Sequence, residues 1–157
     1  MFSTIVWATD GSELSDGALP IVKELARTHG ARIVVVHADA LLTGRFGGAP
    51  LLADEDDVRT KLREQAEEIR TDGFDVELKV KASAMLAPAQ ILVEVAREVE
   101  ADLIVVATHA YGIVGSLFFG SVARALVHES PCAVLTVPPG IARAAHDAET
   151  ALAAAAQ

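Results

Sequence analysis

The sequence predicts an α/β fold in which five strands form a mostly parallel, doubly wound sheet with helices on both faces. Segments with strand-like and helix-like hydrophobic spacing alternate along the chain, and this alternation is typical of βαβ units. Most of the strand segments are continuous apolar runs, which indicates that both of their faces are buried. With 157 residues, the chain fits one domain that buries a full core.

The composition argues against several classes of function. The longest apolar runs, 33–36 and 103–107, are far too short to span a bilayer, so no membrane segment is expected. A net charge of −9 argues against a general nucleic-acid-binding protein, which needs a basic surface. The first residues enter a strand pattern without a signal segment, and Cys132 is the only cysteine. We therefore expect a cytoplasmic protein without an internal disulfide.

The chain begins with a strand, a helix and a second strand. Residues 2–8 are rich in Ile, Val and Trp, and they end at the turn-forming residues 9–12. Apolar residues then recur at helical spacing from Ser12, a suitable N-cap, to Gly30, a suitable helix stop. Residues 31–38 form the second apolar strand, which completes the first alternating unit.

The middle of the chain contains a long connection, an exposed helix and a half-exposed strand. Residues 39–54 are rich in glycine and are interpreted as a long loop. Residues 55–71 carry apolar side chains on one face and charges on the rest, which predicts an amphipathic helix that faces solvent. Residues 74–81 alternate apolar and charged side chains, as expected of a strand at the sheet edge.

The second half of the chain repeats the alternation. A helix is expected from Pro88 to Val99, because proline is favoured in a first helical turn. Residues 103–107 predict the fourth strand, residues 120–128 the fourth helix and residues 132–137 the fifth strand.

The same patterns divide the chain into a folded domain over residues 1–138 and an alanine-rich tail over residues 139–157. The tail is weakly amphipathic and poor in large apolar residues. We expect it either as a short helix or as a disordered segment, and we assign it no function.

Five stretches carry a pattern that is similar to the universal stress protein family. They are residues 5–12, 34–38, 87–89, 102–123 and 128–137, which keep the order and spacing of that family across residues 2–138. The resemblance implies the strand order 3-2-1-4-5. In that order the first and fourth strands are neighbours, so the loops that follow them face each other across a crevice where ligands bind.

Part of that family binds ATP through the motif Gly-x2-Gly-x9-Gly-Ser/Thr, and this chain resembles half of it. Aligned on Gly120 and Ser121, the first two glycines fall on Ala107 and Ala110. The helix start at Ser121 suits a phosphate, because its first backbone amides have no partner within the helix. Alanine, however, resists positive φ, and its methyl group would stand near an approaching phosphate. A rearranged loop that uses the glycines within 112–115 is an alternative.

The candidate ligand site combines the loops after the first and fourth strands. Asp10 stands at the carboxyl end of a strand, where a carboxylate accepts from ribose hydroxyls or holds a hydrated magnesium ion, and the equal alternative is a capping role. The resemblance implies that Thr9 and Val36 line the adenine end. We interpret His109 as a loop residue near phosphate and His37 as structural. The expected cofactor is ATP, with magnesium, and the expected binding residues are Ala8, Thr9, Asp10, Val36, Ala107, His109, Ala110, Gly120, Ser121 and Val122.

Motifs of other α/β families are absent from the sequence. There is no G-x-G-x-x-G fingerprint, and the segment 115–120 is followed by Ser121 rather than by the lysine of a P-loop. No H-x-x-x-H or C-x-x-C spacing exists, so no protein metal site is expected. No G-x-S-x-G elbow surrounds Ser121, so no catalytic residue is expected.

Three interpretations of function stay open. The first is a stress protein that holds ATP or another adenine nucleotide without rapid turnover and signals through its occupied state. The second is a nucleotide-independent dimeric interaction module, which Ala107 and Ala110 favour. The third is a slow ATPase, for which Asp10 is the only candidate base. We favour the first. The resemblance also implies a homodimer through the last strand, residues 132–137, which Pro138 would end by withholding an amide donor.

Overall fold

Five strands form one parallel sheet in the computed structural model, which describes residues 1–40, 52–83, 86–108 and 121–155. The sheet order is β3-β2-β1-β4-β5, and every adjacent pair is parallel. The strands are β1 (Thr4–Ala8), β2 (Arg32–Ala40), β3 (Val76–Ser83), β4 (Leu103–Ala107) and β5 (Ala133–Val137). The predicted fold class and strand order are therefore confirmed. Because β1 and β4 are neighbours, the loops that follow them leave the same edge of the sheet.

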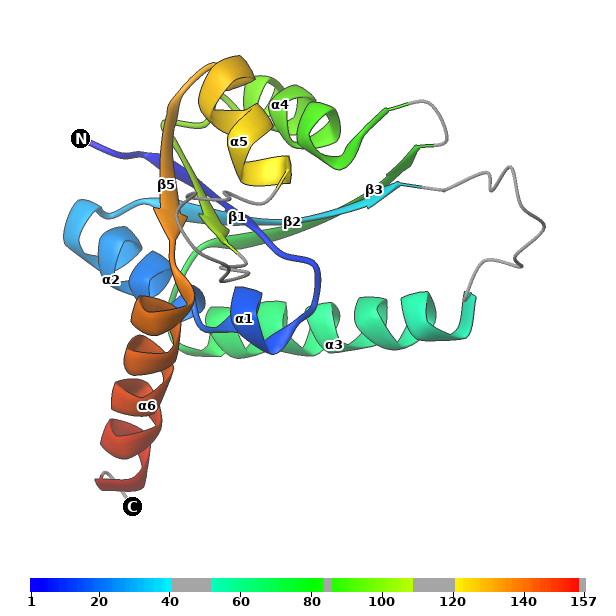
Figure 1. Cartoon of the computed structure of the whole chain (residues 1–157). Helices are drawn as coiled ribbons and strands as arrows, with labels where there is room; N and C mark the ends of the chain where they lie inside the picture. The colour runs from blue at the N-terminus through cyan, green and yellow to red at the C-terminus, as the bar shows by residue number, and fades with distance from the viewer. Residues whose placement is uncertain (41–51, 84–85, 109–120, 156–157) are drawn as a thin grey trace, which may run out of the picture.

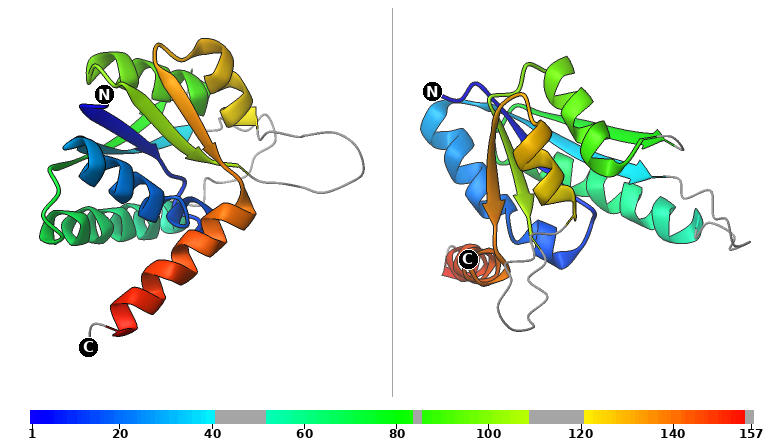
Figure 2. Two further views of the ribbon diagram at one scale, coloured as in Figure 1. Left: turned by 90° about the vertical axis from the view of Figure 1, so that its left-hand side faces the viewer. Right: turned by 45° about the horizontal axis from the view of Figure 1, so that its top comes forward.

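Helices cover both faces of the sheet (Figure 1 and Figure 2). They are α1 (Glu13–Asp16), α2 (Leu19–His29), α3 (Leu52–Thr71), α4 (Pro88–Glu98), α5 (Ser121–Glu129) and α6 (Pro139–Ala155). The helices α4 and α5 lie on one face, and α1, α2 and α3 lie on the other, while α6 projects from the body next to α1 and α2. Among the described helices, none is both long and apolar enough to cross a bilayer.

The strand β1 shows how the sequence builds two cores at once. All five of its residues are buried. Successive side chains of a strand point to opposite faces, so Ile5 and Trp7 pack with the core that α2 and α3 cover, whereas Val6 and Ala8 pack with the core under α4 and α5. The continuous apolar pattern of this strand is thus explained by burial on both faces.

The single helix predicted from Ser12 to Gly30 is wrong, because the structure divides it into α1 and α2. Ser12 is the N-cap of α1, and Gly30 ends α2 with a left-handed φ of 66°, so both predicted ends are confirmed. The break falls at Gly17 and Ala18. Pro20 has no amide hydrogen to donate to the preceding turn, so a new helix begins with proline in its first turn.

Most other predicted elements differ from the structure by one to three residues at an end, and the fourth strand alone has the predicted bounds at both ends. The strand β2 continues to Ala40 and the helix α3 begins at Leu52, so both ends of the predicted connection belong to regular elements, and its residues 41–51 are outside the described residues. The strand β3 lies at the edge of the sheet, as its alternating pattern predicts.

The alanine-rich tail forms the helix α6, which settles the choice between a helix and a disordered segment for residues 139–155. Ala142 is buried in the core, and a Cβ on Gly17 would lie 2.8 Å from the carbonyl oxygen of Ala142, so α6 packs closely on α1. Lys23 of α2 contacts Glu149 of α6 and Asp72 at 3.0 Å each. Burial alone would lower the pKa of Lys23, but its hydrogen bonds to the two carboxylates outweigh that effect and raise the pKa.

Candidate functional site

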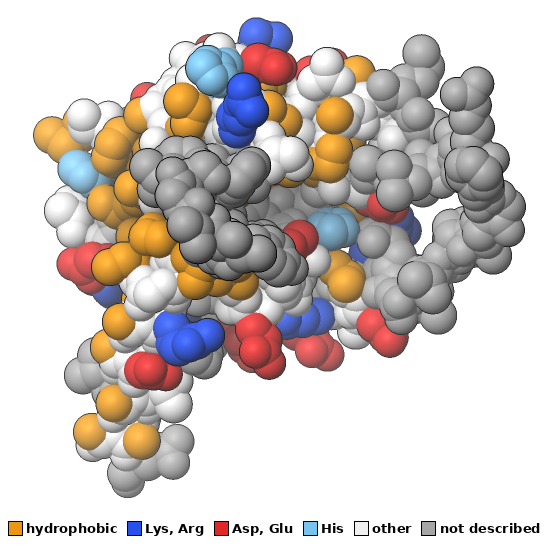
Figure 3. Space-filling view, viewed as in Figure 1, with side chains coloured by type: hydrophobic (Ala, Val, Ile, Leu, Met, Phe, Trp, Pro, Cys, Tyr) orange, Lys and Arg blue, Asp and Glu red, His pale blue; other side chains and the backbone are white. Residues whose placement is uncertain are grey.

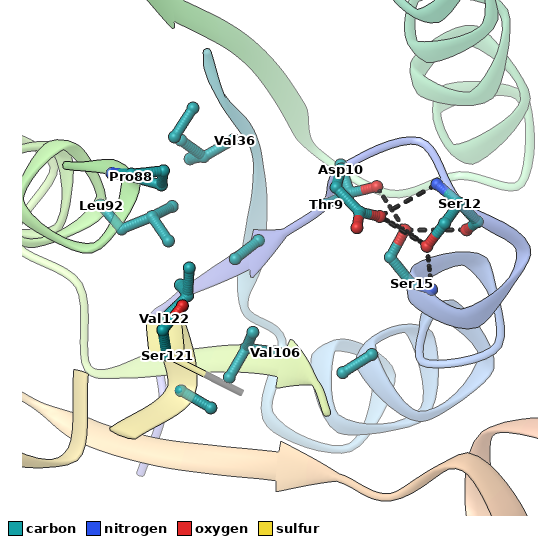
Figure 4. A pocket seen from close by; sticks show the side chains of 14 residues that line it. Thr9, Asp10, Ser12, Ser15, Val36, Pro88, Leu92, Val106, Ser121 and Val122 are labelled. Atoms are coloured by element: carbon teal, nitrogen blue, oxygen red, sulfur yellow. Dashed lines mark hydrogen bonds between the residues drawn. The ribbon is translucent and has the colours of Figure 1, made fainter. Parts of the chain in front are cut away.

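A pocket lies between the carboxyl ends of β1 and β4 and the beginning of α5 (Figure 4). Its volume is about 180 Å³. One wall is apolar and comes from strands β1, β2 and β4 and from α4, while the other is polar and comes from the turn between β1 and α1. The described residues that line it are Ala8, Thr9, Asp10, Ser12, Ser15, Val36, Ala38, Pro88, Leu92, Val106, Ala107, Ser121, Val122 and Ala123.

The pocket brings together seven of the ten residues that we predicted from the sequence. They are Ala8, Thr9, Asp10, Val36, Ala107, Ser121 and Val122. His109, Ala110 and Gly120 lie outside the described residues. The turn after β1, the end of β4 and the start of α5, which lie far apart in the chain, therefore line one cavity. Whether these residues bind a ligand stays a prediction.

The sequence reasoning missed half of the pocket wall. Ser15 lies three residues after the predicted N-cap Ser12. This spacing could have indicated that the two serines belong to the same turn and line the same pocket. Pro88 and Leu92 have the i, i+4 spacing of one helix face, but the sequence does not show that the start of α4 reaches the β1 and β4 loops. This apolar part of the wall depends on tertiary structure.

Asp10 organises the turn between β1 and α1. Its Oδ1 accepts hydrogen bonds from the amide of Ser12 at 3.0 Å, from the Ser12 hydroxyl at 2.6 Å and from the Ser15 hydroxyl at 2.9 Å. The capping role that the sequence suggested is therefore confirmed. The carboxylate is also exposed and lines the pocket, so capping does not remove it from reach of a ligand.

Thr9 fixes the same turn from its buried side. Its amide donates to the carbonyl of Val36 at 3.0 Å, and its hydroxyl accepts from the amide of Gly11 at 3.1 Å. The carbonyl of Thr9 lies 2.9 Å from Nδ1 of His37, which therefore acts as a donor. His37 is buried and is not among the described lining residues, which supports the structural role that we predicted.

The helix α3 holds the turn from outside. Gly11 has a φ of +79°, and a Cβ on it would lie 2.9 Å from Cγ1 of Val58. The Lys61 ammonium donates to the carbonyl of Gly11 at 2.7 Å and to the Asp16 carboxylate at 2.6 Å. Gln65 donates to the other oxygen of Asp16 at 2.9 Å. These contacts tie the turn to α3 and leave little freedom for the side chains that it presents.

Ala107 does not need the conformation that only glycine adopts easily. It is the last residue of β4 and pairs with Val137 of β5, and the amide of Thr108 continues the ladder to the carbonyl of Val137 at 2.9 Å. Among the described non-glycine residues, positive φ occurs only at Glu100. The alanine at this motif position therefore causes no backbone strain, and its methyl group forms part of the pocket wall.

The beginning of α5 faces the pocket with Ser121, Val122 and Ala123. The first backbone amides of a helix lack partners within the helix and carry a partial positive charge, so they suit an anionic group. In the part of the chain that the structure describes, there is no cluster of three or more His, Cys, Asp or Glu side chains that could bind a metal ion. The arrangement fits a ligand with an apolar ring, hydroxyl groups and an anionic end.

Comparisons with known proteins agree with this fold. Residues 1–138 match the sequence model of the Universal stress protein family. A universal stress protein of Thermus aquaticus, from the QAH/OAS sulfhydrylase 3′ region, is 38% identical over 140 residues, which are 87% of this chain and 99% of that protein.

Two solved structures are similar along almost their whole length. A universal stress protein in complex with cAMP has 27% identity and a TM-score of 0.67, over 88% of this chain and 98% of that chain. The universal stress protein of Archaeoglobus fulgidus in complex with dAMP has 26% identity and a TM-score of 0.62, over 87% and 97%.

Proposed function

The chain belongs to the universal stress protein family, and we propose that it binds an adenine nucleotide in the pocket between β1 and β4. It holds the nucleotide, ATP together with magnesium, without rapid turnover, and it signals through its occupied state. The observation that carries this proposal is the pocket itself, which is lined by the turn after β1, the end of β4 and the start of α5. The similar structures described in complex with cAMP and dAMP support the choice of adenine.

Each wall of the pocket has a part in the proposed binding. Val36, Leu92 and Val106 offer an apolar surface to a purine ring. The exposed carboxylate of Asp10 accepts hydrogen bonds from ribose hydroxyls. The amides at the start of α5, near Ser121, receive a phosphate. A magnesium ion, when bound, reduces the negative charge of the phosphates.

Storage of the nucleotide fits this pocket better than turnover. Among the described lining residues, Asp10 is the only candidate for a general base, and its Oδ1 already accepts three hydrogen bonds from the turn. Binding the ground state alone does not accelerate a reaction. A slow ATPase is the weaker candidate, and release of inorganic phosphate during long incubation would reveal it.

Native mass spectrometry of the freshly purified protein tests the proposal. We expect an adduct with the mass of an adenine nucleotide, and added ATP and magnesium should raise the melting temperature. Gly120→Val should abolish this protection if the motif residues hold the phosphates. Gly140→Val is the matched control, because a Cβ on Gly140 meets nothing within 4 Å, and it should keep the protection. A protein that neither carries nor is stabilised by an adenine nucleotide would refute the proposal.

We further propose that the protein is a homodimer that pairs through β5, residues 132–137. The strand β5 lies at the sheet edge, and Val134, Leu135 and Thr136 are half-buried. Hydrophobic side chains gather on the side of the molecule that carries β5 and α2, whereas charged side chains lie along the edge beneath α1 and α3 (Figure 3). A nucleotide-free dimer in solution would favour the second interpretation, an interaction module.

We also propose that the protein is located in the cytoplasm. Its single cysteine cannot form an internal disulfide, and this agrees with a reducing compartment.

A further inference from the structure

The helix α6 follows the part of the chain that matches the family, and it packs against the helix on the polar side of the pocket. The match ends at residue 138, and α6 begins at Pro139. The helices α6 and α1 are in contact, as Figure 1 shows. None of the described lining residues belongs to α6, whereas Ser15 of α1 is one of them. The helix α1 therefore connects α6 to the pocket.

The two helices approach each other most closely at Gly17 and Ala142. A Cβ on Gly17 would lie 2.8 Å from the carbonyl oxygen of Ala142 and 2.9 Å from its Cβ. Ala142 is 1% exposed, so the contact is buried. Gly17 has a φ of −62°, which any residue adopts. Packing against α6, and not backbone conformation, is therefore what excludes a side chain at Gly17.

A second contact fixes α6 further along its length. Nζ of Lys23 in α2 lies 3.0 Å from a carboxylate oxygen of Glu149 in α6 and 3.0 Å from one of Asp72, just after α3. Ala142 and Glu149 are about two helical turns apart and share one face of α6. The helix α6 is therefore held at two points, by α1 and by α2.

The position of Gly17 is coupled to the pocket because α1 is short. It consists of Glu13–Asp16, with Ser12 as its N-cap and Gly17 as its C-cap. Ser12 and Ser15 line the pocket (Figure 4). The Ser15 hydroxyl donates to the carbonyl of Ser12 at 2.8 Å and lies 2.9 Å from the Thr9 hydroxyl. A helix of a single turn does not shift at Gly17 without moving Ser15.

The protein contains its own reporter of the position of α1. Trp7 is the only tryptophan of the chain, and its side chain is fully buried. Its indole Nε1 donates to the carbonyl of Ser15 at 3.2 Å. A shift of α1 changes this hydrogen bond, so the fluorescence of Trp7 responds to it without a label.

We propose that α6 positions α1 and thereby sets the affinity of the pocket for adenine ligands, with Gly17 and Ala142 as positioning residues. The inference rests on the proposed function. The helix α6 acts through the hydroxyl groups of Ser12 and Ser15, which it keeps in one arrangement before the ligand arrives. A change that displaces α1 from α6 therefore weakens binding although it removes no group from the pocket wall.

Gly17→Ala in the full chain tests this coupling, because its methyl group has to separate α1 from the backbone of Ala142. We expect the emission of Trp7 to change in the ligand-free protein. The affinity for ATP with magnesium, measured by calorimetry where the variant is folded, should fall about tenfold, which is the value of about one hydrogen bond. Gly140→Ala, in the first turn of α6, is the matched control, because its Cβ meets nothing within 4 Å, and it should change neither quantity.

Glu149→Gln is a milder variant that keeps the test valid if Gly17→Ala does not fold. It weakens the contact with Lys23 and introduces no steric conflict, so both effects should be smaller and in the same direction. Its matched control is Glu94→Gln, an exposed position on α4 with the same change in charge, which should have no effect.

The outcomes separate this inference from the proposed function. Unchanged affinity in folded Gly17→Ala refutes control of the pocket by α6, and nucleotide binding stands. Weaker binding with unchanged Trp7 emission refutes α1 as the connecting element. If the unaltered protein binds neither adenosine nor ATP with magnesium, the proposed function fails and the inference fails with it.

Discussion

The turn that carries Asp10 has one position where a single methyl group should be costly. Gly11 has a φ of +79°, which an L side chain adopts at a cost of about 1–2 kcal/mol. A Cβ there would also lie 2.9 Å from Cγ1 of Val58 and 3.3 Å from Cγ2. Valine is restricted at χ1, so α3 or the turn has to move, at a cost of about 1–3 kcal/mol for overpacking. We expect Gly11→Ala to reduce the free energy of unfolding by about 2–5 kcal/mol in total.

Urea denaturation followed by circular dichroism measures this loss, and Gly73→Ala is its matched control. Gly73 has a φ of +89°, but a Cβ on it meets nothing within 4 Å, so that variant reports the backbone cost alone. The difference between the two variants is the cost of the Val58 contact. In the Val58→Ala background, Gly11→Ala should cost only the backbone part. Equal losses for Gly11→Ala and Gly73→Ala in the original background would refute the idea that α3 restrains the turn.

The same pair of variants connects the turn to ligand binding. Gly11→Ala displaces the segment that presents Thr9 and Asp10, so the affinity for adenine ligands should fall severalfold, whereas Gly73→Ala should leave it unchanged. Calorimetric titration under conditions where both variants are folded measures this effect. Unchanged affinity in Gly11→Ala would mean that the geometry of the turn does not matter for the ligand.

Three further predictions concern the other parts of the structure. Ala107→Gly should tighten binding of the magnesium–ATP complex severalfold because it removes a methyl group from the pocket wall, at a cost in stability of about 0.5–1 kcal/mol; equal affinity would show that the methyl group is harmless. Val134→Lys should convert the proposed dimer into a folded monomer, and an unchanged mass in light scattering would contradict the β5 interface. Asp102 accepts hydrogen bonds from the amides of Ser3 and Thr4, which lower its pKa below the usual 3.8. The stability that this depressed pKa contributes is present above about pH 4 and is lost as the pH falls through the lowered pKa, so Asp102→Asn should destabilise the protein at neutral pH and make urea stability less dependent on pH in the acid range. Parallel pH profiles of the two proteins would count against this role.

The sequence predicts the sheet well because burial leaves a local pattern. The strand β4 has the predicted bounds, 103–107, since both of its faces are covered and every residue in it is apolar. The edge strand β3 is equally clear, because its charged side chains alternate with apolar ones. The helix from 12 to 30 was predicted without its break, because the apolar spacing continues through Gly17 and hides the interruption before Pro20.

Part of the candidate site could also be predicted, because some of its residues have a recognisable local sequence pattern. Asp10 and Ser12 form a turn from neighbouring residues, and Ser121 marks a helix start, so both carry signals in the local sequence. Nothing in the local sequence indicates that Leu92 lines the apolar wall or that the Lys61 ammonium donates to the carbonyl of Gly11. Both contacts depend on how α4 and α3 pack against residues that are far away in the chain.

The sequence by itself determined the alternation of strands and helices, apart from the break between α1 and α2, together with the polar turn after β1 and the lack of lysine and arginine between residues 108 and 121. The tertiary structure shows that β1 and β4 are neighbours, as the resemblance to the family implied, and it alone shows that the turn after β1, the end of β4 and the start of α5 line one pocket. It also decided the meaning of Ala107. The substitution of a motif glycine suggested strain, but pairing with Val137 keeps this residue in extended backbone that alanine adopts freely. Hydrophobic periodicity is a property of adjacent residues, whereas a pocket is formed by residues that only packing brings together.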